Sequence, residues 1–189
     1  MTRVLIGIGA AGVLIAGGAY FFFGSQNPVV PTGTQKPATG SEIIPVVFPK
    51  REVPTGEKEY QSAQYRFSIL YPQTMTAAEF AESGGATTIT FEDISDPNNL
   101  KGFQVFIAPH MGEEVTVAFV QQRLGSTPQS VEEILIDGAP GLAFITSDQT
   151  LGEVREVWFA HNGFIYQAAA PRPLEALLQE ALQSWRFTP

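Results

Sequence analysis

The pattern of apolar and polar residues divides the chain into three parts, and the first is a continuous apolar run. From Val4 to Phe23 it holds 20 residues and no charged side chain. A helix of that length spans about 30 Å, which matches the hydrocarbon core of a bilayer. Lipid offers no hydrogen bonds, so an isolated apolar run must satisfy its own backbone as a helix. The pattern predicts a single transmembrane helix, with the lipid bilayer as its surroundings.

Charges flanking this run predict its orientation. Arg3 precedes it, and the next charged residue is Lys36. By the positive-inside rule, the N-terminus stays in the cytoplasm and the rest of the chain lies outside. A cleaved signal peptide is the alternative, with Gly17 and Ala19 as small residues before the cut. The run stays apolar to its end, where a cleavage region turns polar, so we favour an uncleaved anchor in the cell membrane.

Three glycines in the run, Gly7, Gly9 and Gly12, spell G-x-G-x-x-G. A dinucleotide-binding turn with this motif needs an amphipathic helix after it and an acidic residue about 20 positions on. Here the continuation is apolar and then rich in proline, and the first acid is Glu42. The glycines are therefore interpreted as small residues of a membrane helix, and no cofactor is expected.

The second part, residues 24–58, contains six prolines. Proline lacks the amide donor and fixes φ, so we expect neither helix nor sheet here but a semi-extended spacer. Pro28 and Pro31 have the spacing of a polyproline ligand, which is also common in spacers. Residues 43–48 (IIPVVF) are more apolar than a spacer requires, and docking of this segment on the domain is an open alternative.

In the third part, residues 59–189, apolar and polar residues alternate in short runs, which is typical of half-buried strands. The segment 74–82 fits helix and strand equally. Asn162-Gly163 between two apolar runs is the strongest hairpin signal, because both residues tolerate the positive φ of a type I′ turn. The predicted strands lie within 60–71 (two strands), 87–91, 103–107, 131–136, 142–146, 154–160 and 164–169, with a short one at Phe187.

Two segments of this part have helical spacing. In 113–124, Val117, Val120 and Leu124 fall on one stripe, two acids occupy the first turn, and Gly125 follows as a cap. In 174–185, leucines, an alanine and Trp185 recur every three or four residues. The fold class predicted is α+β: an antiparallel sheet of about six to eight strands flanked by helices.

Composition narrows the possible functions. The chain has no cysteine, so disulfides and thiolate chemistry are excluded. Residues 59–189 carry six basic and sixteen acidic side chains, a net charge of −10. Such a surface repels phosphate backbones, so nucleic acid is not an expected partner. Another envelope or membrane protein remains possible, and the oligomeric state is left open.

Residues that could support catalysis are few. His110 and His161 are the two histidines, and no serine lies in a G-x-S-x-G motif. A hydrolase using His161 or a pair of carboxylates is retained as the alternative to a binding protein. Two histidines without cysteine also make a poor zinc site.

The loop that begins after the strand at 87–91 contains a weak candidate cation site. Glu92, Asp93 and Asp96 offer hard oxygen ligands, as calcium prefers. Their spacing differs from that of an EF-hand, so a solvated loop is the favoured interpretation and no metal is expected.

Trp158 is the candidate for a partner surface. In the strand 154–160, Val157 and Phe159 fall on one face and Trp158 on the other. If that second face is uncovered, Trp158 is exposed and available to a partner. The favoured alternative is that a helix or the spacer covers it.

Four motifs in order resemble the PsbP/Mog1-like superfamily, which includes small membrane-anchored bacterial proteins with a PsbP-like domain. They are YRFSILYP (residues 65–72), IDGAPG (136–141), VWFAHNGFIYQ (157–167) and SWRF (184–187). One departure is that QTM follows the Tyr-Pro pair, where members of the family often carry tryptophan. The resemblance implies an α/β/α sandwich with an antiparallel sheet and no enzymatic activity.

These observations favour a membrane-anchored, non-catalytic binding or accessory domain in the extracytoplasmic space. Two alternatives stay open, the hydrolase and a purely structural tethered domain of an envelope assembly.

Overall fold

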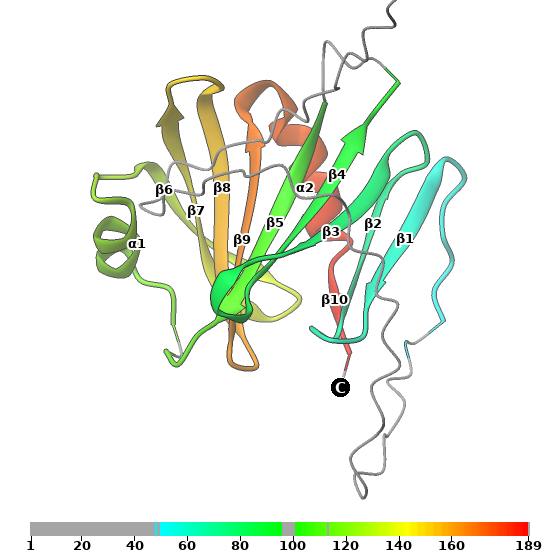
Figure 1. Cartoon of the computed structure of the whole chain (residues 1–189), viewed down its shortest axis with the longest axis horizontal. Coiled ribbons are helices and arrows are strands. Elements are labelled where there is room, and N and C mark those ends of the chain that lie inside the picture. Colours follow the sequence, from blue (N-terminus) through cyan, green and yellow to red (C-terminus); the bar gives the residue numbers. More distant parts are fainter. Residues whose placement is uncertain (1–47, 49, 96–100, 113, 189) are drawn as a thin grey trace, which may run out of the picture.

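The computed structural model of the chain describes residues 48, 50–95, 101–112 and 114–188 (Figure 1). The predicted transmembrane run, 4–23, lies outside these residues; within them, no helix combines the length and apolar character that crossing a membrane requires. The strands are β1 (Glu57–Ser62), β2 (Phe67–Pro72), β3 (Thr76–Ala81), β4 (Thr87–Asp93), β5 (Lys101–Pro109), β6 (Gln129–Ile136), β7 (Ala139–Asp148), β8 (Gly152–His161), β9 (Phe164–Pro171) and β10 (Arg186–Phe187), and the α-helices are α1 (Val117–Leu124) and α2 (Glu175–Gln183).

The strands form two antiparallel sheets, of seven and three strands. The larger has the order β3-β4-β5-β9-β8-β7-β6 and the smaller β1-β2-β10. The α+β class and the antiparallel pairing are thus confirmed. The seven strands of the larger sheet agree with the predicted six to eight, but the strands predicted within 60–71 do not join it, because β2 pairs with β1 and with β10.

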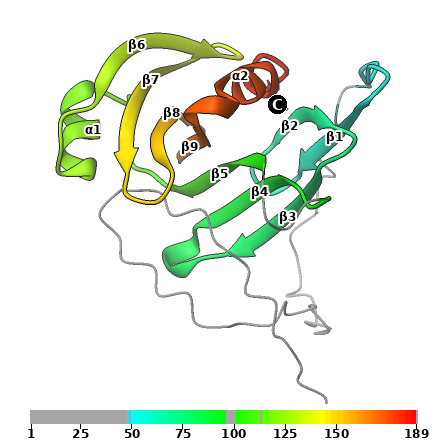
Figure 2. The ribbon, with the colours of Figure 1, turned by 90° about the horizontal axis from the view of Figure 1, so that it is seen from above.

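The larger sheet is strongly curved, and the two helices lie on opposite faces of it. Figure 2 shows α2 and the small sheet on the concave side, with α1 on the outer side near β6, β7 and β8. Because side chains alternate along each strand, the two faces of the sheet belong to two separate cores. Phe159 of β8 packs in the core under α2, and its neighbour Trp158 packs in the core under α1.

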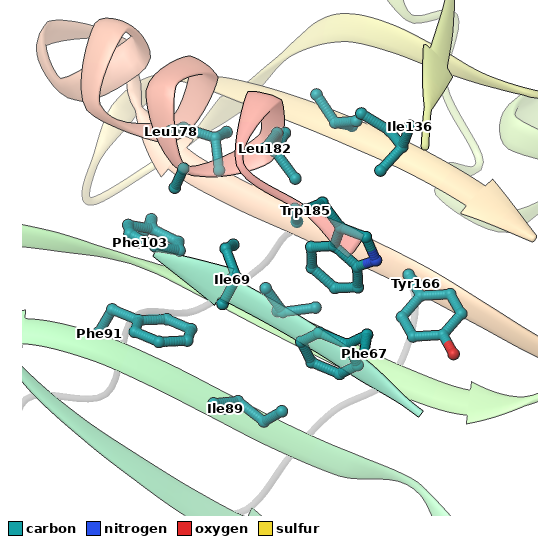
Figure 3. Packing of buried hydrophobic residues seen from close by; sticks show 14 of the residues in the cluster. Phe67, Ile69, Ile89, Phe91, Phe103, Ile136, Tyr166, Leu178, Leu182 and Trp185 are labelled. Atoms are coloured by element: carbon teal, nitrogen blue, oxygen red, sulfur yellow. The ribbon is translucent and has the colours of Figure 1, made fainter. Parts of the chain in front are cut away.

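The concave core is built from stacked and edge-on aromatic rings. The Trp185 ring, between α2 and β10, stacks on Phe67 of β2 with centroids 4.0 Å apart. It meets Phe159 and Tyr166 edge-on, at 5.2 and 5.5 Å. Figure 3 shows this cluster between the small sheet, α2 and the concave face of the large sheet. Such pairs contribute about 0.5–1.5 kcal/mol each beyond the burial of their area.

Two tight turns fix the register of the last strands. Asn162 and Gly163, between β8 and β9, have φ of 47° and 80°, and Asp137 and Gly138, between β6 and β7, have 46° and 86°. These are the positive φ values of type I′ turns, and they confirm the turn predicted at Asn162-Gly163. Beyond the second turn, a Cβ on Gly141 would lie 2.6 Å from the carbonyl oxygen of Trp158. The glycines of the IDGAPG motif therefore serve backbone geometry.

The predicted helix at 113–124 begins later than expected. Its first residue is Val117, because the Thr116 hydroxyl caps it by accepting a hydrogen bond from the Phe119 N–H at 3.2 Å. Gly125 ends it in the left-handed conformation, with φ 66°, as predicted.

The N-terminal boundary of the folded part also differs from expectation. Strand β1 begins at Glu57, so regular structure enters the last two residues of the predicted spacer, 24–58. Arg51 forms an ion pair with Glu59 at 3.2 Å and donates a hydrogen bond to the carbonyl oxygen of Ser184. Of the apolar segment 43–48, only Phe48 is described, and it is half-buried. The ambiguous segment 74–82 contains strand β3, which pairs with β4.

Candidate functional site

His161 ends β8 and packs as an aromatic ring. Its ring stacks on Phe187 of β10 with centroids 3.7 Å apart. Burial lowers its pKa, against the opposing charge of Asp137. That carboxylate also accepts a hydrogen bond from the Phe187 N–H at 2.7 Å. These contacts join the ends of β6, β8 and β10.

His110 lies on the opposite face of the sheet. The backbone N–H of His110 donates a hydrogen bond to the carbonyl oxygen of Gly163 at 2.8 Å. The His110 ring meets the Phe119 ring of α1 edge-on, with centroids 5.2 Å apart. The Nε2 atom is buried and has no hydrogen-bond partner within the described part of the chain. The fold therefore separates the two histidines by the thickness of the sheet.

Of the three acids proposed as weak cation ligands, the structure describes Glu92 and Asp93. Glu92 and Asp93 are adjacent in β4, so their side chains leave opposite faces of the strand. Burial raises the pKa of Glu92. Hydrogen bonds with Ser95 lower the pKa of Asp93, whose Oδ1 accepts the Ser95 N–H at 3.0 Å. Asp96 lies outside the described residues. Searched over those residues alone, the chain shows no group of three metal-ligating side chains.

Trp158 is 2% exposed, so it does not contribute to an accessible partner surface. Its ring lies edge-on to Phe144 of β7 and Phe119 of α1, at 5.5 and 6.4 Å. Helix α1 covers Trp158, which is the alternative favoured from the sequence.

Beside Trp158 lies a buried carboxylate that the sequence analysis did not single out. Glu156 is 1% exposed, and burial raises its pKa. Its two oxygens accept hydrogen bonds from the Thr146 hydroxyl at 2.6 Å and from the Trp158 Nε1–H at 2.7 Å. Both donors oppose the rise in pKa. Glu156 shares one face of β8 with Val154 and Trp158. An acid between two apolar residues on that face was the signal in the sequence that could have identified a buried carboxylate.

Both ends of the larger sheet carry exposed apolar side chains, and the most exposed one in the described strands lies at the β6 end. Leu135 of β6 is 72% exposed, and Val131 is also exposed. Strand β6 is the last of the larger sheet, so one of its edges faces away from β7. An exposed edge with apolar side chains is a site where another chain can add a strand.

A depression lies on each side of this edge strand. The first, of about 660 Å³, lies between β6, β7 and the start of α1, with Glu114, Glu133 and Leu135 among its lining residues. The second, of about 340 Å³, lies between β6 and α2 and is lined by Ile134 and Leu178. Leu135 lines both. The edge therefore offers an exposed apolar side chain, Leu135, with room beside it.

One half-buried cation links β6 to β8 and α2. Arg155 of β8 forms ion pairs with Glu132 of β6 at 3.0 Å and with Glu175 of α2 at 3.3 Å. Its side chain is only 12% exposed. Arg172 shares Glu175 at 2.7 Å. These ion pairs connect the edge strand to β8 and α2.

The fold and the site together define a small α+β domain with an exposed apolar side chain, Leu135, on an edge strand of a curved antiparallel sheet. No protein-family model matches the sequence, and no curated protein matches it.

Among solved structures, the chain is similar to the solution structure of cyanobacterial PsbP (CyanoP) from Synechocystis sp. PCC 6803. The TM-score is 0.50 at 10% identity, over 75% of this chain and 98% of that one. A crystal structure from Bacteroides thetaiotaomicron VPI-5482 is similar with a TM-score of 0.48 at 11% identity, over 70% and 49% of the two chains. The likeness to CyanoP shows that this chain has a PsbP-like fold, as the motifs predicted.

Proposed function

We propose that this protein is a single-pass membrane protein whose C-terminal domain is a non-catalytic binding or accessory domain in the extracytoplasmic space. The observation that carries the proposal is Leu135, a large apolar side chain that is 72% exposed on an edge strand between two depressions. Burial of such a side chain contributes about 1.5–3 kcal/mol, so a partner that covers it gains affinity.

The sequence supplies the membrane part of the proposal. The run 4–23 is long and apolar enough to anchor the chain, and Arg3 favours a cytoplasmic N-terminus. The proline-rich residues that follow act as a spacer between the bilayer and the domain. The binding surface then faces other proteins of the envelope.

Photocrosslinking of the full chain in its native cells tests the binding function. A photoreactive residue in place of Leu135 is expected to give a discrete crosslinked product with another protein. The matched control is Phe80 of β3, which is 52% exposed at the opposite end of the same sheet. Products that are the same at both positions, or absent at Leu135, would contradict the proposed surface.

Topology is tested separately. Protease added outside intact cells, after the outer layer has been made permeable, is expected to digest the domain and spare a cytoplasmic control protein. Full protection of the domain would contradict the extracytoplasmic location.

A further inference from the structure

The pairing of β6 with β7 identifies which backbone N–H and C=O groups of β6 remain available for hydrogen bonds to another strand. A two-residue turn at Asp137-Gly138 makes its flanking residues, Ile136 and Ala139, a hydrogen-bonded pair. Alternate residues of β6 then direct their backbone groups to the other side. Glu133 and Leu135 therefore point their N–H and C=O groups away from β7.

In the described part of the chain, these outward groups meet no other strand. The order of the larger sheet ends at β6. Between Gln129 and Glu132, a bulge interrupts the pairing with β7, and Ser130 has a φ of 49°. The available edge is therefore the short regular stretch from Glu132 to Leu135. It provides two donors and two acceptors, about what an added strand of four residues uses.

The charge around this stretch is negative. Glu132 and Glu133 lie on opposite faces of β6, and Glu114 lines the first depression with Glu133. The neighbouring cation, Arg155, is already paired with Glu132 and Glu175. Pairing of two β6 edges would bring four carboxylates together, and like charges across a strand pair are destabilising. Charge complementarity thus disfavours a second copy of this chain and favours a basic segment.

Resting on the proposed binding function, we propose that the β6 edge recognises an extended basic segment of a partner protein, which adds to the sheet as an antiparallel strand. Its residues opposite Leu135 and Ile134 are apolar, and those opposite Glu133 and Glu132 are lysine or arginine. The apolar pair covers the exposed Leu135 and enters the depression beside α2, where Ile134 lies. Backbone hydrogen bonds provide affinity, and the side chains provide selectivity.

The probe is a capped peptide, Thr-Val-Val-Lys-Lys-Thr, titrated into the full chain in detergent and followed by the amide resonances of β6. We expect saturable shifts at Glu133 and Leu135 and weaker binding at high salt. N-methylation of the first valine and first lysine removes the two amides that face β6 and should weaken binding at least about tenfold. N-methylation of the second valine and second lysine, whose amides point outward, is the matched control and should change affinity less than about threefold.

Charge is tested on the protein. Glu133→Lys should weaken binding of the probe at least about fivefold, because it replaces attraction with repulsion. Glu153→Lys is the control, since Glu153 is exposed at the far end of β8, and it should have little effect. An acidic probe, Thr-Val-Val-Glu-Glu-Thr, should not bind.

The outcomes separate this inference from the proposed function. Equal loss of affinity from both N-methylated probes, or none from either, would overturn strand addition. Absence of any binding by the probe would also overturn strand addition. If the photoreactive residue at position 135 still crosslinks a protein, the proposed binding function stands. A Leu135 crosslink found only to a second copy of this chain would replace the basic partner with self-association. Failure of both the crosslink and the probe would reject the two proposals together.

Discussion

Trp185 and Leu135 are both large apolar residues, but the fold places them in opposite surroundings. Trp185 is fully buried and contacts rings from β2, β8, β9 and β10. Leu135 is 72% exposed on an edge strand and is flanked by two depressions. The first residue belongs to the core of the fold, and the second to its surface.

The motifs that carry the family resemblance lie on the core side of this comparison. Phe67, Tyr166 and Trp185 come from three different motifs and meet in one cluster. Ser184, also in a motif, accepts a hydrogen bond from the Leu70 N–H at 2.7 Å and donates one to the Ala181 carbonyl at 2.6 Å. Phe67, Tyr166 and Trp185 belong to the core of this PsbP-like fold. Such residues determine how the chain packs, whereas binding of a ligand depends on a site elsewhere on the fold.

The largest effect is expected from Trp185→Ala. Removing a buried indole loses its transfer free energy and leaves a cavity, which together lower the free energy of unfolding by about 3–5 kcal/mol. Urea denaturation of the full chain measures this loss. Phe80→Ala on the exposed part of β3 is the control, and a change there as large as at Trp185 would contradict the assigned core.

A smaller effect is expected from Gly141→Ala, because a Cβ at this position would meet the Trp158 carbonyl oxygen and the Phe159 Cβ at 2.6 and 2.7 Å. Strands β7 and β8 must then separate, which lowers the free energy of unfolding by about 1–3 kcal/mol. The same denaturation experiment measures it. Glu153→Ala, at an exposed position of β8, should stay within about 0.5 kcal/mol of the parent. Equal stability of Gly141→Ala and the parent would show that the strands are less closely apposed.

A pH-dependent effect is expected from Glu156→Gln. Burial raises the folded-state pKa of Glu156 above its ordinary value of 4.5. Above pH 4.5 the folded state therefore binds more protons than the unfolded state, and the stability contributed by this group falls as the pH rises through the folded pKa. Glutamine remains neutral, so the variant should lose less stability than the parent between pH 5 and 7. Urea denaturation at several pH values checks this, with Glu153→Gln as the exposed control. An unchanged slope in Glu156→Gln would contradict the pKa shift.

The smallest effect on stability is expected from Leu135→Lys. The side chain is largely in solvent, so the free energy of unfolding should change by less than about 0.5 kcal/mol. Lysine is also well tolerated on edge strands. A loss comparable to that of Gly141→Ala would show that Leu135 belongs to the core and would break the comparison between the two regions.

Local patterns in the sequence predicted much of the fold. Alternation found the strands, the Asn162-Gly163 turn gave one hairpin, and the apolar stripe ending at Trp185 gave the last helix. Alternation assigns side chains to two faces but does not say which strand is the neighbour, so the separate sheet of β1, β2 and β10 was missed. The start of α1 was also misplaced, because Thr116 is a stronger cap than the preceding acids.

The candidate site was harder to predict for the same reason. The sequence placed Trp158 opposite Phe159 but could not say that Phe119 of α1 covers it. Leu135 was visible as one apolar residue of a strand. Its exposure depends on the position of β6 at the end of the sheet, which arises from long-range pairing that local spacing does not encode.

The most direct test of the β6 edge as the recognition surface uses one pair of chains in native cells. Both carry a photoreactive residue at Val131, which is exposed on β6, and one also carries Leu135→Lys. We predict a discrete crosslinked partner in the first chain and its loss in the second, while both chains have the same urea denaturation midpoint. An equally strong crosslink to the same partner in both chains would contradict the account.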